Sequence, residues 1–244
     1  MLIKKLASAL AAVLLAALPI VASANEGSYE PAGNDVRNIA SLQRGARNFM
    51  NYCSGCHSAK FVRYNRLAED LRIPEAELMK NLMFTSEKPF DTINSAMPVE
   101  SAKSWFGAAP PDVSLIARSR GTDYIYAYLH GFYRDPSRPT GVNNTVLKGT
   151  AMPHVLADLQ GVQTAVFKTE GEMKEFEKFE LTQKGTLTPE QYDDFVRDTV
   201  NFLQYIGEPI ETKRKDLGVW VTLFLLMFTG FAYLLYKEYW KDVR

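Results

Sequence analysis

The chain has 244 residues, of which 46% are hydrophobic and 23% charged, and this composition excludes a disordered protein. Its 28 basic and 28 acidic residues cancel, so it lacks the basic excess that is typical of nucleic-acid-binding proteins. Two cysteines are too few for a disulfide scaffold in a chain of this length. The sequence predicts one globular domain with a distinctive segment at each end.

Residues 1–24 are predicted to be a cleaved secretory signal. Lys4 and Lys5 precede an apolar stretch of about 13 residues, and Ala22-Ser23-Ala24 provides small residues for cleavage. That stretch is too short to cross the ~30 Å hydrocarbon core of a membrane. We therefore expect a mature chain that begins at Asn25, with residues 25–210 exported to the periplasm.

The other end is predicted to span the membrane once. Leu217–Tyr236 provides 20 consecutive residues without a charge. At ~1.5 Å per residue, a helix of that length crosses a bilayer core. Aromatic residues cluster near both of its ends, as in membrane-interface belts. We expect an inner-membrane protein with its domain on the periplasmic side and residues 237–244 in the cytoplasm.

The region between these ends is predicted to be mainly α-helical. Apolar spacing indicates a helix over residues 35–52, and proline with early glutamates indicates another over 74–83. A capping box predicts a third helix over 188–207. Residues 85–112, rich in proline and small residues, are expected to form an irregular loop. The pattern in residues 124–132 fits either a strand or a helix.

A C-x-x-C-H motif runs from Cys53 to His57 and is typical of c-type haem attachment. Both thiols can bond the vinyl groups of one porphyrin, and the histidine can then bind the iron. Three alternatives are weaker. A zinc site needs further nearby ligands, a redox dithiol favours a βαβ context, and a structural disulfide does not need His57. The motif predicts one covalently bound haem c per chain, because only Cys53 and Cys56 are present.

The second axial ligand of such a haem is not fixed by spacing. Its candidates in the exported part are methionines and histidines, namely Met50, Met79, Met83, Met97, Met152, Met173, His130 and His154. Met50 is too near the attachment motif to reach the opposite haem face. Met97 and Met152 both occur in Ala-Met-Pro, and His154 follows Met152 closely. From the residues alone, these three remain open.

Further segments in a fixed order resemble the cytochrome c1 family. They surround the haem motif and continue downstream as Tyr64-Asn65-Arg66-Leu67, Ala109-Pro110-Pro111-Asp112-Val113-Ser114, Ile116–Gly121, Asp123–Phe132 and Gly149-Thr150-Ala151-Met152-Pro153. With the C-terminal anchor, the resemblance covers residues 35–244. It implies a class I cytochrome c-like haem domain on a single transmembrane helix.

The resemblance also assigns roles to the principal ligands. It implies that Cys53 and Cys56 form the thioether bonds to haem. His57 corresponds to the proximal iron ligand, and Met152 corresponds to the distal one.

Three further positions follow from the same resemblance. Arg120 matches an arginine that contacts a haem propionate, and Tyr124 matches a residue beside the haem. The carbonyl of Pro110 or Pro111 is expected to accept a hydrogen bond from His57 Nδ1.

The function implied by the resemblance is one-electron transfer within ubiquinol–cytochrome c reductase. The expected partners are cytochrome b, a Rieske-type iron–sulfur subunit that gives electrons, and a cytochrome c that accepts them. The chain alone is not expected to be an enzyme. Two alternatives remain: another tethered c-type cytochrome such as an oxidase subunit, or a haem enzyme or gas sensor with an open iron site.

Residues 170–198 carry nine acidic residues against four basic ones. This segment is either a pair of solvated helix faces or a surface that steers a basic cytochrome c.

Overall fold

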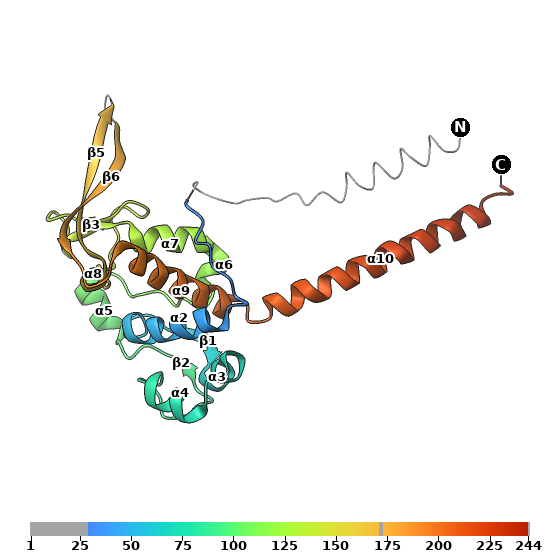
Figure 1. Ribbon diagram of the computed structural model, residues 1–244, viewed down its shortest axis with the longest axis horizontal. Helices are drawn as coiled ribbons and strands as arrows, with labels where there is room; N and C mark the ends of the chain where they lie inside the picture. The colour runs from blue at the N-terminus through green and yellow to red at the C-terminus, as the bar shows by residue number, and fades with distance from the viewer. Residues whose placement is uncertain (1–28, 171–172, 244) are drawn as a thin grey trace.

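The computed structural model describes residues 29–170 and 173–243, so the predicted signal at 1–24 lies outside the described part (Figure 1). The helices are α2 (Ile39–Tyr52), α3 (Tyr64–Leu71), α4 (Glu75–Asn81), α5 (Val99–Phe106), α6 (Ile116–Arg120), α7 (Thr122–His130), α8 (Ala157–Gln160), α9 (Pro189–Gly207) and α10 (Glu211–Tyr239). The strands are β1 (Ala59–Arg63), β2 (Thr92–Ile93), β3 (Phe132–Arg134), β4 (Val142–Asn144), β5 (Gly161–Glu170) and β6 (Met173–Lys184). The mainly α-helical prediction is confirmed.

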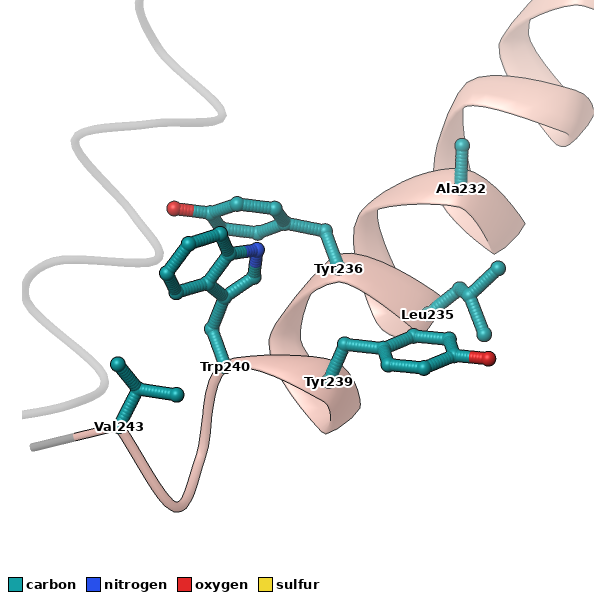
Figure 2. A pocket seen from close by; sticks show the side chains of 6 residues that line it. All are labelled: Ala232, Leu235, Tyr236, Tyr239, Trp240 and Val243. Carbon is teal, nitrogen blue, oxygen red and sulfur yellow. The ribbon is translucent and has the colours of Figure 1, made fainter.

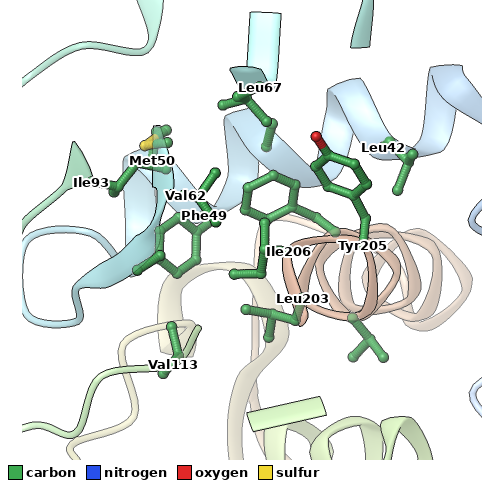
Figure 3. Packing of buried hydrophobic residues seen from close by; sticks show 14 of the residues in the cluster. Leu42, Phe49, Met50, Val62, Leu67, Ile93, Val113, Leu203, Tyr205 and Ile206 are labelled. Atoms are coloured by element: carbon green, nitrogen blue, oxygen red, sulfur yellow. The ribbon is translucent and has the colours of Figure 1, made fainter. Parts of the chain in front are cut away.

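Helices α2 and α9 lie side by side at the centre of the domain (Figure 1). Their backbones meet closely at Gly45, where an added Cβ atom would lie 2.0 Å from the carbonyl oxygen of Asp198. Phe49 then packs on Phe202 with ring centroids 5.5 Å apart. Figure 3 shows Phe49 among the buried side chains of this core, with Leu203 of α9 nearby. Because both helices bury these apolar side chains, each fixes the other's position.

Buried polar groups set the register of the same two helices. The Arg44 guanidinium donates to both carboxylate oxygens of Asp198, from Nε at 2.5 Å and from Nη2 at 2.9 Å. Asn201, fully buried on α9, donates to the Asp35 carbonyl and to the Ser41 hydroxyl. A shift of either helix would leave these buried groups unpaired, which costs free energy.

The predicted helices are present, with ends set by their caps. Asn38 accepts a hydrogen bond from Ser41 N–H, so the first helix begins at residue 39 and not at 35. Thr188 and Gln191 form the predicted capping box at the start of α9. Residues 122–130, which the pattern left open between strand and helix, form the helix α7.

The expectation of an irregular loop over residues 85–112 is wrong in part. Ile93 of β2 pairs with Ala59 of β1, and both side chains are buried. Helix α5 begins after Pro98 and ends at Gly107, whose φ of +77° suits glycine. These short elements escaped detection because their apolar residues are too few to show a period.

A long antiparallel hairpin of β5 and β6 projects from the domain (Figure 1). The interpretation of residues 170–198 as a pair of helix faces is therefore wrong, because residues 173–184 are a strand. Asp198 is buried against Arg44 and does not contribute to a surface. On the hairpin, Glu177 pairs with Lys168 at 3.2 Å. The acidic excess is thus divided between two elements and partly neutralised.

Helix α10 leaves the domain as one long apolar helix (Figure 1). Residues 219–243 are exposed along its whole length, which suits a helix surrounded by lipid. It is the one helix among the described residues that is long and apolar enough to cross a membrane. Its base is tied to the domain, because Glu208 accepts hydrogen bonds from both Arg118 and Arg214. Arg37 adds an ion pair with Asp216 at 3.0 Å.

The far end of α10 carries aromatic side chains around a shallow groove (Figure 2). The rings of Tyr236 and Trp240 lie 6.2 Å apart, and the Tyr239 ring points to the other side of the helix (Figure 2). Amphipathic rings at the end of an apolar helix are typical of membrane interfaces.

We expect Gly45→Ala to destabilise the domain by about 3 kcal/mol or more, because the new methyl group would overlap the Asp198 carbonyl. Denaturant unfolding followed by circular dichroism measures this loss. Arg47→Ala, at an exposed position of the same helix, serves as the control. Equal unfolding midpoints for the two variants would contradict the expected close contact.

Candidate functional site

The C-x-x-C-H motif forms a tight turn at the end of α2. Cys53 caps the helix, and its N–H donates to the Phe49 carbonyl at 2.8 Å. Its own carbonyl accepts from the N–H groups of Cys56 and His57, at 3.1 and 2.8 Å. This turn places the two sulfur atoms and the imidazole on one side of the chain, beside the same pocket.

Neighbouring serines hold the turn in place. The buried Ser54 hydroxyl donates to the Met50 carbonyl, and the Ser95 hydroxyl donates to the Gly55 carbonyl, each at 2.7 Å. The Ser95 N–H in turn donates to the Ser58 hydroxyl at 2.8 Å. The motif is thus tied to the segment that follows β2, a connection that its own sequence does not indicate.

His57 is oriented by a carbonyl from a distant segment. Its Nδ1 lies 2.8 Å from the Pro111 carbonyl oxygen, which can only accept, so Nδ1 carries the proton. Nε2 is then left with a lone pair, which is the form that binds a metal. Burial lowers the pKa of His57, although the hydrogen bond to Pro111 opposes this change. The lowered pKa favours the neutral ring. Of the two prolines considered, Pro111 makes the contact.

Asp112 fastens the loop that carries Pro111. Its carboxylate accepts from the Lys60 N–H at 3.0 Å and from the Ser114 N–H at 2.9 Å. Burial opposes ionisation of Asp112, but the hydrogen bonds from Ser114 and Lys60 together outweigh it and lower the pKa of this carboxyl group.

A pocket of about 400 Å³ gathers the predicted site residues. It is lined mostly by apolar side chains from α2, α6, α7, α9 and the segments 106–113 and 147–155. The predicted residues that line it are Cys53, Cys56, His57, Pro110, Pro111, Arg120, Tyr124 and Met152. An apolar cavity with two thiols, an imidazole and a thioether suits a haem c, which needs exactly two thioether sites and tolerates a soft sulfur ligand.

The positions of the candidate residues distinguish between the possible distal ligands. Met152 lines the pocket, whereas Met97 and His154 do not. The His154 ring stacks on Phe132, with centroids 4.9 Å apart and an interplanar angle of 3°. Burial lowers the pKa of His154 to about 4, so this ring is neutral and packed in the protein interior. Met50 belongs to the buried core beneath the motif.

One wall of the pocket is built by a column of aromatic rings on α7. The Arg120 guanidinium lies over the Tyr124 ring, 5.5 Å from its centroid. Tyr124 stacks on Tyr128 at 6.2 Å, and the Tyr128 hydroxyl bonds the Thr150 hydroxyl at 2.7 Å. Sequence reasoning missed Tyr128 and Thr150. The four-residue spacing from Tyr124 to Tyr128 was the available signal for one of them.

Two alternative uses of the cysteines are disfavoured. Burial raises the pKa of the Cys53 thiol to about 12, whereas a redox-active dithiol needs a lowered pKa. A zinc site would need further ligands, and the described residues contain no group of three or more His, Cys, Asp or Glu side chains that could hold a metal ion.

Comparisons with known proteins agree with this geometry. Residues 34–243 match the model of the Cytochrome C1 family. Cytochrome c1 of Allochromatium vinosum is 49% identical over 235 residues, which cover 95% of this chain and 96% of that relative. A protein named ammonia monooxygenase gamma subunit, from Nitrosomonas europaea, is 43% identical and covers 96% of this chain and 97% of its own. Cytochrome c1 of Rhodospirillum rubrum is 29% identical over 83% of this chain and 82% of the relative.

The lowered pKa of Asp112 predicts a pH-dependent contribution to stability. The ionised carboxylate stabilises the fold above the unfolded-state pKa of about 4, and this contribution is lost as the pH falls through the lower folded-state value. We expect Asp112→Asn to lower the free energy of unfolding by about 1 kcal/mol at neutral pH. The difference from the unaltered protein should shrink below about pH 4.

Urea unfolding at several pH values measures both quantities. Asp158→Asn, at an exposed position of α8, is the control. A difference that grows as the solution becomes more acidic would contradict the role assigned to Asp112.

Proposed function

The chain belongs to the cytochrome c1 family, and on this premise we propose that it binds one haem c covalently through Cys53 and Cys56. Members of this family are haem-containing electron carriers of the cytochrome bc1 complex. The observation that carries the proposal is the convergence of both cysteines, His57 and Met152 on one apolar pocket. In this proposal His57 is the proximal ligand of the iron and Met152 the distal one.

Haem c supplies a one-electron couple at its iron, and the chain supplies the surroundings that tune it. The Pro111 carbonyl orients His57 and raises the basicity of its free nitrogen. The apolar lining excludes water, and a histidine–methionine pair favours a high reduction potential. Arg120, at the pocket edge beside Tyr124, provides a guanidinium that suits a propionate carboxylate.

The proposed route of the electron is from a Rieske-type iron–sulfur protein to this haem and then to a cytochrome c. We assign quinol chemistry to the partner subunits, because His57 and Met152 would both hold the haem, which would supply one-electron transfer and no substrate site. The subunit is thus an electron carrier and not an enzyme by itself. The split acidic surface gives little support to electrostatic steering of the acceptor.

The proposed topology places residues 25–210 in the periplasm and residues 237–244 in the cytoplasm. The supporting features are the signal-like residues 1–24 and the apolar helix α10, whose membrane-spanning part is exposed. In that arrangement the haem domain rests against the outer face of the inner membrane.

A second candidate is electron transfer in a different membrane complex. The observation that favours this second candidate is the name of the Nitrosomonas relative, which is 43% identical and is called a monooxygenase subunit. Purification from membranes in mild detergent separates the two candidates. Cytochrome b and an iron–sulfur subunit in stoichiometric amounts would support the bc1 complex, and their replacement by monooxygenase subunits would support the alternative.

Covalent attachment predicts that acid–acetone extraction leaves the haem with the protein, since thioether bonds survive this treatment. Cys53→Ser and Cys56→Ser should each retain at most one thioether, which shifts the pyridine haemochrome spectrum. Arg47→Ala, which alters an exposed residue of α2 and keeps both thiols, is the control. Extractable haem in the unaltered protein, or two haems per chain, would contradict the proposal.

The assignment of Met152 predicts a specific spectral loss. Met152→Leu should abolish the weak near-infrared band of an iron–thioether bond and lower the reduction potential. Met97→Leu and His154→Ala should keep the band, because neither residue lines the pocket. If Met97→Leu loses the band and Met152→Leu keeps it, Met97 is the distal ligand and the assignment of Met152 is wrong.

A further inference from the structure

The segment that carries Met152 has no regular secondary structure of its own. Strand β4 ends at Asn144 and helix α8 begins at Ala157, so Met152 lies midway along an irregular connection. A thioether is a neutral, weak ligand, and a loop that is free to move would let it leave the pocket at little cost. The hydrogen bonds that hold this connection are therefore important for the proposed distal ligand.

Both peptide groups of Gly149, three residues before Met152, are bound by side chains from the preceding hairpin. The Gly149 N–H donates to Asn143 Oδ1 at 2.8 Å. Its carbonyl accepts from Arg138 Nη2, also at 2.8 Å. Gly149 has φ of +78°, a conformation that glycine adopts without strain. Gly149 is thus hydrogen-bonded through both its N–H and its carbonyl group, and the donor to the carbonyl is the charged Arg138.

The two residues that bind Gly149 are anchored in different ways, Asn143 through its side chain and Arg138 through its backbone. Asn143 Nδ2 donates to the Asp135 carboxylate at 2.9 Å, which orients the amide so that Oδ1 faces the Gly149 N–H. Asn143 Oδ1 also accepts from the Asn144 N–H at 2.9 Å. The Arg138 main chain hydrogen-bonds with Asp135 and Gly141, whereas its buried Nε has no hydrogen-bond partner among the described residues. The Asn143 side chain is therefore held in place before it meets the loop, and the Arg138 side chain reaches the loop from an anchored backbone.

We propose that Arg138 and Asn143 are positioning residues that hold the loop of Met152 against the haem pocket through Gly149. This inference rests on the proposed function, because it needs Met152 as the distal iron ligand. Neither side chain lines the pocket, so both act through the loop and not by contact with the haem. The Tyr128–Thr150 hydrogen bond secures the loop from the pocket side, and the two attachments lie on adjacent residues.

The test uses the full-length haem protein with Arg138→Gln, Arg138→Lys, Asn143→Ala and the double variant Arg138→Gln/Asn143→Ala. Arg134→Gln is the matched control, because it removes an exposed arginine from the same hairpin. Three quantities are measured: the near-infrared iron–thioether band, the fraction of reduced protein that binds carbon monoxide, and hydrogen exchange at the amides of Gly149 and Thr150.

Loss of the charged donor should raise the carbon-monoxide-reactive fraction about tenfold, equivalent to about 1.4 kcal/mol. The double variant should exceed either single variant, and Arg138→Lys should recover part of the effect because it keeps a charged donor. The Gly149 amide should exchange faster in Asn143→Ala. The control should match the unaltered protein in all three measurements. If Asn143→Ala does not fold, the two Arg138 variants decide the outcome.

Two results would overturn the inference in distinguishable ways. If the unaltered protein has a Met152-dependent band, and the Arg138 and Asn143 variants match Arg134→Gln, the positioning role is wrong and the ligand assignment stands. If Met152→Leu keeps the band, the ligand assignment itself is wrong, and the positioning role falls with it.

Discussion

The close contact of α2 with α9 at Gly45 is the constraint on which the haem pocket depends. Because residue 45 has no side chain, the two backbones touch, and Arg44 can reach the buried Asp198 with both arms of its guanidinium. That contact fixes the position of α2, which ends at Tyr52 and is capped by Cys53. The position of the haem attachment motif is therefore set by packing that begins two helical turns earlier.

The pocket itself is assembled from segments far apart in the chain, and each segment contributes one kind of group. The end of α2 provides the thiols and the imidazole, and the Pro111 loop provides the carbonyl that orients it. Helix α7 provides the aromatic wall, and the loop after β4 provides Met152. Since no segment holds the cofactor site alone, the folded domain is what brings these groups together.

The sequence predicted features that depend on neighbouring residues, but it did not predict most contacts between distant segments. The haem motif, the Thr188 capping box and the apolar anchor each depend on residues that lie close together. The structure confirms the capping box and the long apolar helix, and the family match agrees with a haem cofactor. The β5–β6 hairpin was missed because two register shifts, one of them between Val166 and Phe167, break the alternation that marks a strand. The Pro111 contact with His57 was expected only through the family resemblance, as one of two prolines. The contacts at Gly149 join residues that only the fold brings together, so no pattern in the sequence predicts them.

The base of α10 has a consequence for how the proposed electron transfer proceeds in space. Glu208 joins Arg118 of the haem domain to Arg214 of the anchor, and Arg37 reaches across to Asp216. Arg118 lies on the short helix α6, which also carries Arg120 at the pocket edge. In the proposed topology, these ion pairs would limit how far the domain can move relative to its anchor. In the proposed electron transfer, the donor and acceptor proteins would then have to move to this domain.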